Sequence, residues 1–244
     1  MKQSFLAGGE QTLNNTGYMT GTLDLYSREF IEFAGKSTGW VLDIGACYGV
    51  ATLPALAKGA KIIATDNDER HLEILRSRAA ADDQDRLKLM VGSLPNKLDL
   101  KKESVSAILC CRVLHLLKEE EIEESIGHMY DWLERGGRLY LINDTPYVGY
   151  TDKLIQEFVP LYKKRKQDGL KWPGYIPNLK FYLRPEYHAF SPEVLTLTDV
   201  DELVDTCERC GFEIIKSGFI ARPDYPSSLQ NDGRENAGVV AIKR

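Results

Sequence analysis

Val41-Leu42-Asp43-Ile44-Gly45-Ala46-Cys47-Tyr48-Gly49 is the segment from which the fold of this 244-residue chain can be inferred. The apolar run from Trp40 to Ile44 predicts a short buried strand. Glycine at the two loop positions of the segment lets that strand turn tightly into a helix, whose free amide groups would face a crevice. The residues from Val50 to Leu56 have the apolar spacing of that helix, and Pro54 is compatible with it only in the first turn.

The same switch between short apolar runs and helical stripes recurs along the chain. Further strands are predicted at Lys61–Thr65, Leu87–Val91, Val105–Cys110, Arg138–Ile142, Phe212–Ser217 and Ala237–Lys243. Further helices are predicted at Glu69–Ala80, Glu119–Glu134, Thr151–Lys166 and Val200–Cys210. Because strands and helices largely alternate, we predict an α/β fold with a doubly wound, seven-stranded, mostly parallel sheet and helices on both faces. The pair Gly136-Gly137 is expected to end the helix before the fifth strand.

Composition narrows the class of protein. The chain has 36 Asp+Glu against 31 Lys+Arg and a net charge of -5, which argues against nucleic acid as the main partner. No stretch approaches the ~20 apolar residues of a membrane span, and the segment Met1–Glu10 lacks the apolar run of a signal peptide. The five cysteines are odd in number and scattered, so we expect reduced thiols in a cytoplasmic protein. Cys207 and Cys210 form a single Cys-x-x-Cys motif. We interpret it as two thiols on adjacent turns of a helix in preference to a zinc or redox site.

The regular pattern breaks after Asp144. Residues 146–192 hold six of the ten prolines and six of the twelve tyrosines, and we interpret them as an inserted lid or substrate region. Residues 1–36 form a predicted N-terminal cap, and residues 37–145 with 193–244 form the main domain. We expect the insertion, with the N-terminal segment around Tyr18 and Tyr26, to close over the bound ligands.

Asp43 discriminates between the ligands that such a fold could bind. A dinucleotide fingerprint requires Gly-x-Gly-x-x-Gly, but Cys47 and Val50 occupy its second and third glycine positions. A carboxylate two residues before Gly45 would repel a pyrophosphate, whereas it suits a ligand that carries an ammonium and a sulfonium. The residues therefore favour S-adenosylmethionine over a nicotinamide dinucleotide. Asp43 could instead cap a helix or belong to a buried ion pair.

Taken together, these residues resemble motif I of the class I (Rossmann-like) S-adenosylmethionine-dependent methyltransferases. The resemblance is good from Ser37 to Asp144 and looser from Val200 to Arg244. It implies an antiparallel last strand, S-adenosylmethionine as the cofactor, and an enzyme that transfers a methyl group. The run from Cys110 to Leu116 resembles the segment after strand four in the small-molecule branch, so a small-molecule methyl acceptor is the implied partner.

The resemblance also implies which residues contact the cofactor. Asp66 matches the acidic residue that binds both ribose hydroxyls, since a carboxylate can accept two hydrogen bonds from a cis-diol; it could otherwise only cap the next helix. Gly92-Ser93 stands at the adenine-edge position, where the family commonly has Asp. The implied cofactor-binding residues are Asp43, Gly45, Ala46, Cys47, Gly49, Asp66, Asn67, Gly92, Ser93, Cys110, Cys111 and Arg112.

Methyl transfer from a sulfonium is an in-line displacement, so a general base is needed only if the nucleophile arrives protonated. His115 is the leading candidate for that base, followed by Tyr147 and His188, although His115 could be a packed histidine under the sheet edge. His71 and His128 fall within helices and are expected to be structural or solvated. No set of about four ligands has a recognisable spacing, so no metal is predicted.

Two other functions stay open. A protein or RNA methyltransferase is indicated by the basic run Lys163–Lys166 alone, which is also typical of a solvated helix face. A catalytically inactive partner protein is compatible with Cys47, Ser93 and Arg135, which depart from the family pattern. Asn143–Tyr147 resembles the loop of nucleic-acid amine methyltransferases but follows the wrong strand, and we interpret it as the start of the insertion. The acceptor atom and the oligomeric state are not determined by the sequence.

Overall fold

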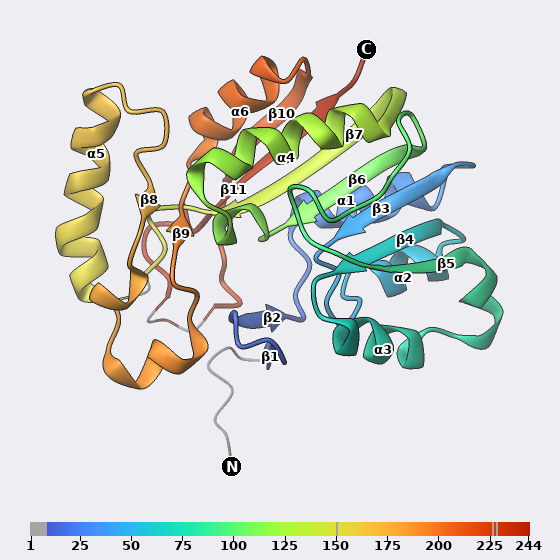
Figure 1. Ribbon diagram of the computed structural model, residues 1–244, viewed down its shortest axis with the longest axis horizontal. Coiled ribbons are helices and arrows are strands. Elements are labelled where there is room, and N and C mark those ends of the chain that lie inside the picture. The colour runs from blue at the N-terminus through green and yellow to red at the C-terminus, as the bar shows by residue number, and fades with distance from the viewer. Residues whose placement is uncertain (1–8, 150, 226, 228) are drawn as a thin grey trace.

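The computed structural model of this protein describes residues 9–149, 151–225, 227 and 229–244, and a seven-stranded sheet forms its centre (Figure 1). The strands lie in the order β10-β11-β7-β6-β3-β4-β5. Their bounds are β3 Trp40–Ile44, β4 Lys61–Asp66, β5 Leu87–Val91, β6 Val105–Cys111, β7 Leu133–Asp144, β10 Glu213–Ile220 and β11 Asn236–Ile242. The strands from β7 to β5 pair in parallel, and β11 pairs antiparallel with both β7 and β10. The predicted sheet is confirmed, including its antiparallel last strand.

Helices cover both faces of the sheet. One face carries α1 (Leu25–Ala34), α2 (Thr52–Ala57) and α3 (Glu69–Arg78), and the other carries α4 (Glu119–Trp132) and α6 (Val200–Arg209). Successive strand residues point to opposite faces, so Ile108 of β6 packs in the core under α4 while Leu109 packs in the core under α1. The doubly wound arrangement therefore has two apolar layers, one on each side of the sheet.

Side chains cap the first turns of α3 and α6. Asp68 caps α3 through its side chain, and Asp199 forms a capping box with Glu202 at the start of α6. The helix α1 was not predicted, although its signal was present. Asp24 accepts hydrogen bonds from the backbone amides of Tyr26 and Ser27, as an N-cap residue does.

The predicted helix end at Gly136-Gly137 is wrong. The helix α4 ends at Trp132, and β7 already begins at Leu133, which pairs with Val105 of β6. Gly136 has a positive φ of 81° and its N–H donates to the carbonyl of Lys243 at 2.7 Å. The two neighbouring strands therefore hold this glycine inside the strand, a long-range effect that local turn signals cannot show.

The predicted insertion, residues 146–192, lies beside the sheet (Figure 1). Its buried apolar side chains form a small cluster that also includes Leu195 and Leu197. Its elements are the π-helix η3 (Leu154–Phe158), α5 (Val159–Gln167), β8 (Tyr175–Ile176), and the 3₁₀ helices η4 (Leu179–Phe181) and η5 (Pro185–Phe190). The predicted helix Thr151–Lys166 is thus divided, because Pro160 at the start of α5 has no N–H to donate. β8 pairs with β9 (Leu195–Thr196), just beyond the predicted boundary of the insertion.

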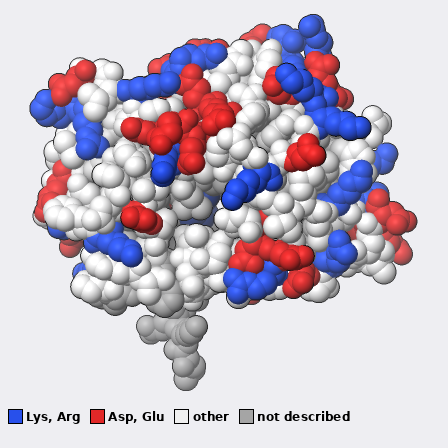
Figure 2. Space-filling view, viewed as in Figure 1, with Lys and Arg blue, Asp and Glu red and all other residues white. Residues whose placement is uncertain are grey.

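The N-terminal segment forms a hairpin of β1 (Gly9–Gln11) and β2 (Tyr18–Thr20), which lies between α3 and the insertion (Figure 1). The remaining short helices are η1 (Ala81–Arg86) and η2 (Leu114–Leu116). Figure 2 shows Lys and Arg residues interspersed with Asp and Glu over the same face of the molecule. Within the described ranges, none of the helices combines the length and apolar composition needed to cross a bilayer.

Candidate active site

A cavity of about 1040 Å³ lies at the carboxyl ends of β3, β4 and β6. This is where open α/β sheets bind ligands, because the strand order reverses at that edge. The cavity is at or above the upper end of the about 300–1000 Å³ that is typical of small-molecule sites, so it can hold two ligands side by side. The β1–β2 hairpin forms one wall, and residues of the insertion, among them Leu179 and Leu183, form another.

Asp43 ends β3 inside this cavity and is only 3% exposed. Its Oδ2 accepts a hydrogen bond from Oγ1 of Thr52, the first residue of α2, at 2.6 Å. Burial raises the pKa of Asp43 to about 7, and the Thr52 hydrogen bond offsets part of that rise. A cationic ligand group beside Asp43 would favour its ionised form, which makes this carboxyl a suitable partner for an ammonium.

The loop after Asp43 requires an unusual backbone. Gly45 has a φ of +70°, and a Cβ there would overlap a methyl group of Val113, so only glycine fits. Cys47 adopts a φ of +47°, a left-handed conformation that costs a non-glycine residue about 1–2 kcal/mol. Its N–H donates to Oδ2 of Asp66 at 3.0 Å, which helps to hold the conformation. Strained residues of this kind gather at functional sites, and Arg112, with a φ of +59°, lines the same cavity.

Asp66 ends β4 and its carboxylate is already well supplied with donors. Oδ2 accepts from the Cys47 amide, and Oδ1 accepts from the Asp68 amide at 3.0 Å and from Nδ1 of His71 at 2.9 Å. A carboxylate offers about four lone-pair directions. About one direction, on Oδ2, therefore remains for a ligand hydroxyl, fewer than the two hydrogen bonds that the sequence comparison implies.

The other predicted cofactor residues divide into two groups. Ala46, Asn67, Gly92, Ser93, Cys111 and Arg112 line the cavity, together with Asp43, Gly45, Cys47 and Asp66. Gly92 has no room for a Cβ, which would overlap the carbonyl of Lys97. Gly49 and Cys110 do not line it, because Gly49 faces the side chains of Leu53 and Leu75 and Cys110 is fully buried in the core.

His115, in η2, is the predicted base that lines the cavity. It is 7% exposed, its backbone N–H donates to Oδ1 of Asn143 at 2.9 Å, and its Nδ1 has no hydrogen-bond partner. Burial lowers the pKa of His115, so the imidazole is neutral near pH 7 and can accept a proton. A buried polar atom without a partner is costly, and an acceptor in the cavity could relieve that cost by engaging the ring.

Tyr147 and His188 are not among the residues that line the cavity. The ring of Tyr147 packs edge-on against Tyr162 and Phe219, and the guanidinium of Arg234 lies 3.7 Å from its centre. Burial raises the pKa of Tyr147, which keeps its phenol protonated. Nε2 of His188 lies 3.2 Å from the carbonyl of Leu183, within the insertion. Their predicted catalytic roles stay predictions that this geometry does not favour.

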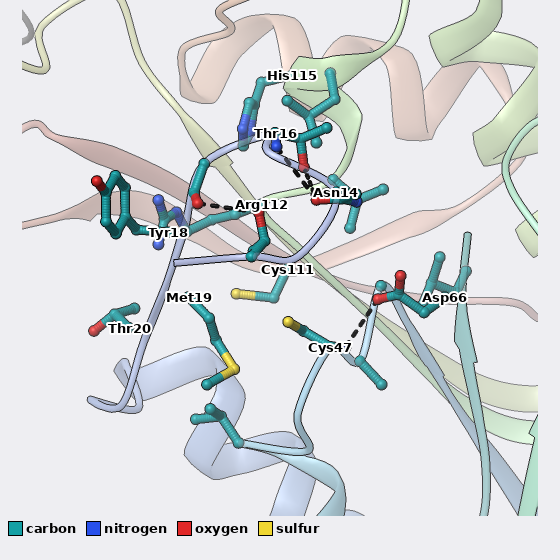
Figure 3. Close-up of a pocket in the computed structure, with 18 of the residues that line it drawn as sticks. Asn14, Thr16, Tyr18, Met19, Thr20, Cys47, Asp66, Cys111, Arg112 and His115 are labelled. Atoms are coloured by element: carbon teal, nitrogen blue, oxygen red, sulfur yellow. Dashed lines mark hydrogen bonds between the residues drawn. The ribbon is translucent and has the colours of Figure 1, made fainter. Parts of the chain in front are cut away.

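Sequence reasoning expected the N-terminal segment at the site but did not identify Met19 as part of the cavity wall. Figure 3 shows the sulfur atoms of Met19, Cys47 and Cys111 around the middle of the cavity, with Asp66 on one side and His115 on the other. Met19 had no local signal, because it reaches the site only through pairing of β1 with β2. Tyr18 lines the cavity as expected, but Tyr26 packs against Gly238 of β11 in the core.

His71 is buried and hydrogen-bonded, in agreement with its predicted structural role, and it also lines this cavity. It is 1% exposed, and both of its ring nitrogens form hydrogen bonds, one of them to Asp66. Ligand atoms of Cys47, Asp66 and His71 lie within 4.8 Å of one another. Because both nitrogens of His71 are occupied, the side chains of His71 and Asp66 form a hydrogen-bonded support for the backbone of Cys47 in this conformation.

The end of the cavity near His115 is lined mainly by leucines. They come from the segment after β6, from the insertion and from the loop before β11, and comprise Leu116, Leu117, Leu179, Leu183, Leu195 and Leu229. Arg112 and Arg222 line the same end, where the first pairs with Asp144 and the second with Asp224. This half is therefore suited to an apolar ligand, with polar groups at its edge.

Comparisons with known proteins agree with this geometry. Residues 41–137 match the family model of a methyltransferase domain. A solved S-adenosylmethionine-dependent methyltransferase from Methanosarcina mazei is 18% identical with a TM-score of 0.67, and the match covers 91% of this chain and 99% of that chain. The search of curated proteins found no significant match.

Two further solved structures are similar in fold and carry cofactor. The glycopeptide N-methyltransferase MtfA with S-adenosylmethionine is 18% identical, with a TM-score of 0.57 and coverage of 89% of this chain and 92% of that chain. The magnesium protoporphyrin IX methyltransferase from Synechocystis, with S-adenosylhomocysteine bound, is 17% identical, with a TM-score of 0.56 and coverage of 89% and 81%. At these identities the likeness shows the fold, and the acceptors of the two proteins differ.

Proposed function

Because this chain belongs to the class I S-adenosylmethionine-dependent methyltransferases, we propose that it transfers the methyl group of S-adenosylmethionine to a small, apolar acceptor bound beside His115. The buried carboxyl of Asp43 at the carboxyl end of β3 is the observation that carries the proposal. It faces a cavity whose opposite end is lined by leucines and a neutral histidine.

The residues present fit this cofactor. Asp43 would hold the ammonium of its amino-acid tail, and Asp66 would accept a hydrogen bond from its ribose. The glycine-rich loop lets the backbone approach the ligand closely, since Gly45 has no room for a side chain. Gly92 and Ser93 line the cavity beyond the end of β5, where the adenine would lie.

The mechanism follows from the arrangement of the two halves. S-adenosylmethionine supplies an activated methyl group on a sulfonium when bound. The residues at the leucine-lined end would hold the acceptor on the far side of that methyl, and in-line transfer would need nucleophile, carbon and sulfur to be collinear. His115 takes the proton of an acceptor hydroxyl as the new oxygen–carbon bond forms and the sulfur–carbon bond breaks. The products are a methyl ether and the neutral sulfide, with the proton on the imidazole.

The lining supports a small acceptor more than a polymer. Three of the four residues in the basic run of α5, which is the feature that favours RNA, have partners within the chain. Lys164 pairs with Asp168, Arg165 donates to the carbonyls of Pro173 and Tyr175, and Lys166 pairs with Asp199.

The five cysteines are all free thiols, which supports the proposed cytoplasmic location.

The proposal is tested with His115→Ala and the matched control His188→Ala. Calorimetry measures the affinity of each protein for S-adenosylhomocysteine, and release of that product is assayed with a panel of apolar phenols, alcohols and amines. We expect His115→Ala to bind S-adenosylhomocysteine normally and to lose turnover about 10²–10⁴-fold with a hydroxyl acceptor, while His188→Ala retains turnover. A wild-type protein that binds neither form of the cofactor would overturn the proposal, and undiminished turnover in His115→Ala would remove the base.

A further inference from the structure

We propose that His71 is a positioning residue that links the β1–β2 hairpin to Asp66, so that the hairpin closes over the cavity when the cofactor binds. This inference rests on the proposed function, because it needs Asp66 to contact the cofactor. Its basis is a buried chain of hydrogen bonds that runs from the hairpin loop through one imidazole to the carboxylate at the end of β4.

The hydrogen bonds determine the tautomer of His71. The backbone N–H of Leu13 donates to Nε2 at 3.0 Å, so Nε2 carries a lone pair. The proton therefore resides on Nδ1, which donates to Oδ1 of Asp66 at 2.9 Å. The imidazole is neutral and has one tautomer, and it can hold both partners only in this form. If Nε2 carried a proton, its N–H would point at the N–H of Leu13, and two donors cannot form a hydrogen bond with each other.

The ring is held in place by its surroundings. It lies edge-on to the ring of Tyr48 with a distance of 5.1 Å between the ring centres, and it is 1% exposed. The hydroxyl of Tyr48 in turn donates to the carbonyl of Gln11 in β1 at 3.1 Å. A buried ring with both nitrogens hydrogen-bonded has little freedom to rotate. A displacement of the hairpin would therefore change the orientation of the Asp66 carboxylate through this ring.

Other contacts fasten the hairpin to the same region but do not reach the carboxylate. Arg70 donates to the carbonyl of Leu13 at 3.1 Å, Asn14 donates to Oδ1 of Asn67 at 3.0 Å, and Arg78 pairs with Glu10 at 3.2 Å. These pairs are exposed, and exposed pairs contribute little to stability. The contact through His71 is the buried one of this group, which is why the linkage is assigned to it.

The hairpin and Asp66 bound the same cavity. Thr16, Tyr18 and Met19 face the cavity from the hairpin, across from Asp66 (Figure 3). His71 uses Oδ1 of Asp66, while Oδ2 accepts from the Cys47 amide and keeps one lone-pair direction for a ligand hydroxyl. A cofactor that contacts both Oδ2 and the hairpin therefore favours the closed hairpin, and the closed hairpin favours the cofactor by the same factor.

Two substitutions separate the two hydrogen bonds. In His71→Asn the amide NH₂ takes the place of Nδ1 and keeps the donor to Asp66, but nothing reaches Leu13. In His71→Phe the ring still packs on Tyr48 and both hydrogen bonds are lost. Arg78→Gln is the matched control, because it removes the exposed pair with Glu10 of the hairpin and Arg78 does not line the cavity. Circular dichroism checks that each variant is folded.

The experiment measures the affinity for S-adenosylhomocysteine by calorimetry and the hydrogen exchange of the hairpin amides with and without that ligand. In the wild type we expect the ligand to slow exchange at residues 11–20. We expect about 5–150-fold weaker binding in His71→Asn, the usual range of coupling between sites, with loss of the ligand-dependent protection, and still weaker binding in His71→Phe. Arg78→Gln should behave as the wild type.

A spectroscopic measurement keeps the inference testable if the variants misfold. Nitrogen NMR of the wild type should show His71 protonated at Nδ1 and unprotonated at Nε2, with the ligand slowing exchange of the Nδ1 proton. The opposite tautomer, or normal affinity and normal protection in His71→Asn, would overturn the inference. A wild type that binds no S-adenosylhomocysteine would instead overturn the proposed function.

Discussion

Asp43 and Asp66 lie at the carboxyl ends of neighbouring strands, yet their carboxyl groups differ in the number and kind of hydrogen-bond donors. Asp66 accepts three hydrogen bonds, two of them from backbone amides, whereas Asp43 accepts from the hydroxyl and the backbone of Thr52. Burial without a neighbouring cation raises the pKa of Asp43 to about 7. Asp43 is thus poised to ionise when a cation arrives.

This difference predicts a pH dependence of cofactor binding. In the free protein Asp43 is mostly protonated below about pH 7, and binding of an ammonium group requires the ionised form. The affinity for S-adenosylhomocysteine should therefore rise as the pH rises toward 7 and level off above it. Calorimetry between pH 5.5 and 7.5 measures this. In Asp43→Asn the slope should vanish and binding should weaken about 10–100-fold, because a charged hydrogen bond contributes about 1.5–3 kcal/mol. A wild-type affinity that is independent of pH would contradict this role of Asp43.

The residues that carry the site were partly predictable. Asp43, Gly45 and Asp66 were found because a strand end followed by glycine is a local pattern. His71 was not found, since its importance depends on Leu13, which is 58 residues away. Likewise, the local sequence does not show that His115 lines the cavity and Tyr147 does not. Tyr147 is buried because it packs against Arg234 and Phe219, which are distant in the sequence.

At the scale of elements, a polar cluster joins the insertion to the main domain. Tyr162 of α5 lies 2.6 Å from Oδ2 of Asp199 and 2.8 Å from Oε1 of Glu202, both at the start of α6. Lys166 contacts the same Asp199 oxygen at 2.6 Å. Burial and the nearby Asp199 charge raise the pKa of Glu202 to about 7, while the pKa of Asp199 is lowered. The protonated Glu202 therefore donates to the oxygen of Tyr162, whose hydroxyl donates to the ionised Asp199.

This cluster predicts that stability falls as the pH rises. The folded protein keeps the Glu202 proton up to about pH 7, whereas the unfolded chain loses it near 4.5. Between these values the folded state binds more protons, so the free energy of unfolding decreases with rising pH. Urea unfolding at pH 5 and pH 7.5 should show the decrease. In Glu202→Gln, which keeps a donor for Tyr162 and the capping role, the decrease should be smaller by on the order of 1–2 kcal/mol. Equal decreases in the two proteins would refute the assignment.

The elements themselves were mostly predictable from periodicity. All seven sheet strands were found, because each is a short apolar run bounded by turn residues. The division of η3 from α5 and the early start of β7 were not found. In both cases the regular hydrogen bonds of an α-helix are not formed. Pro160 has no N–H to donate to one, and Leu133 pairs with Val105 of the neighbouring strand instead.

At the scale of the whole molecule, the cavity is enclosed by two segments that are distant in sequence. The hairpin from the N-terminus and the predicted insertion approach it from different sides (Figure 1). Neither wall belongs to the sheet that holds Asp43 and Asp66. The architecture therefore separates the cofactor-binding framework from the parts that shape the acceptor end.

This separation predicts that ligand binding protects the insertion. Lys180 is exposed in η4, next to the lining residue Leu179, and offers a trypsin site. Cleavage there requires local opening, so bound S-adenosylhomocysteine should slow it. Cleavage is followed on gels over time, with a nicotinamide nucleotide as the control that should give no protection. Unchanged cutting between Tyr147 and His188 would mean that the insertion does not close over the site.

The sequence by itself determined the sheet, the order of its elements, the glycine loop and the aspartates that point to S-adenosylmethionine. These follow from residue spacing and turn chemistry, which act between near neighbours in the chain. Only the tertiary structure decided which histidine lines the cavity, why Tyr147 does not, and how His71 joins the hairpin to Asp66. Such contacts arise when distant segments pack together, and burial and hydrogen bonding there depend on partners that no local pattern reveals.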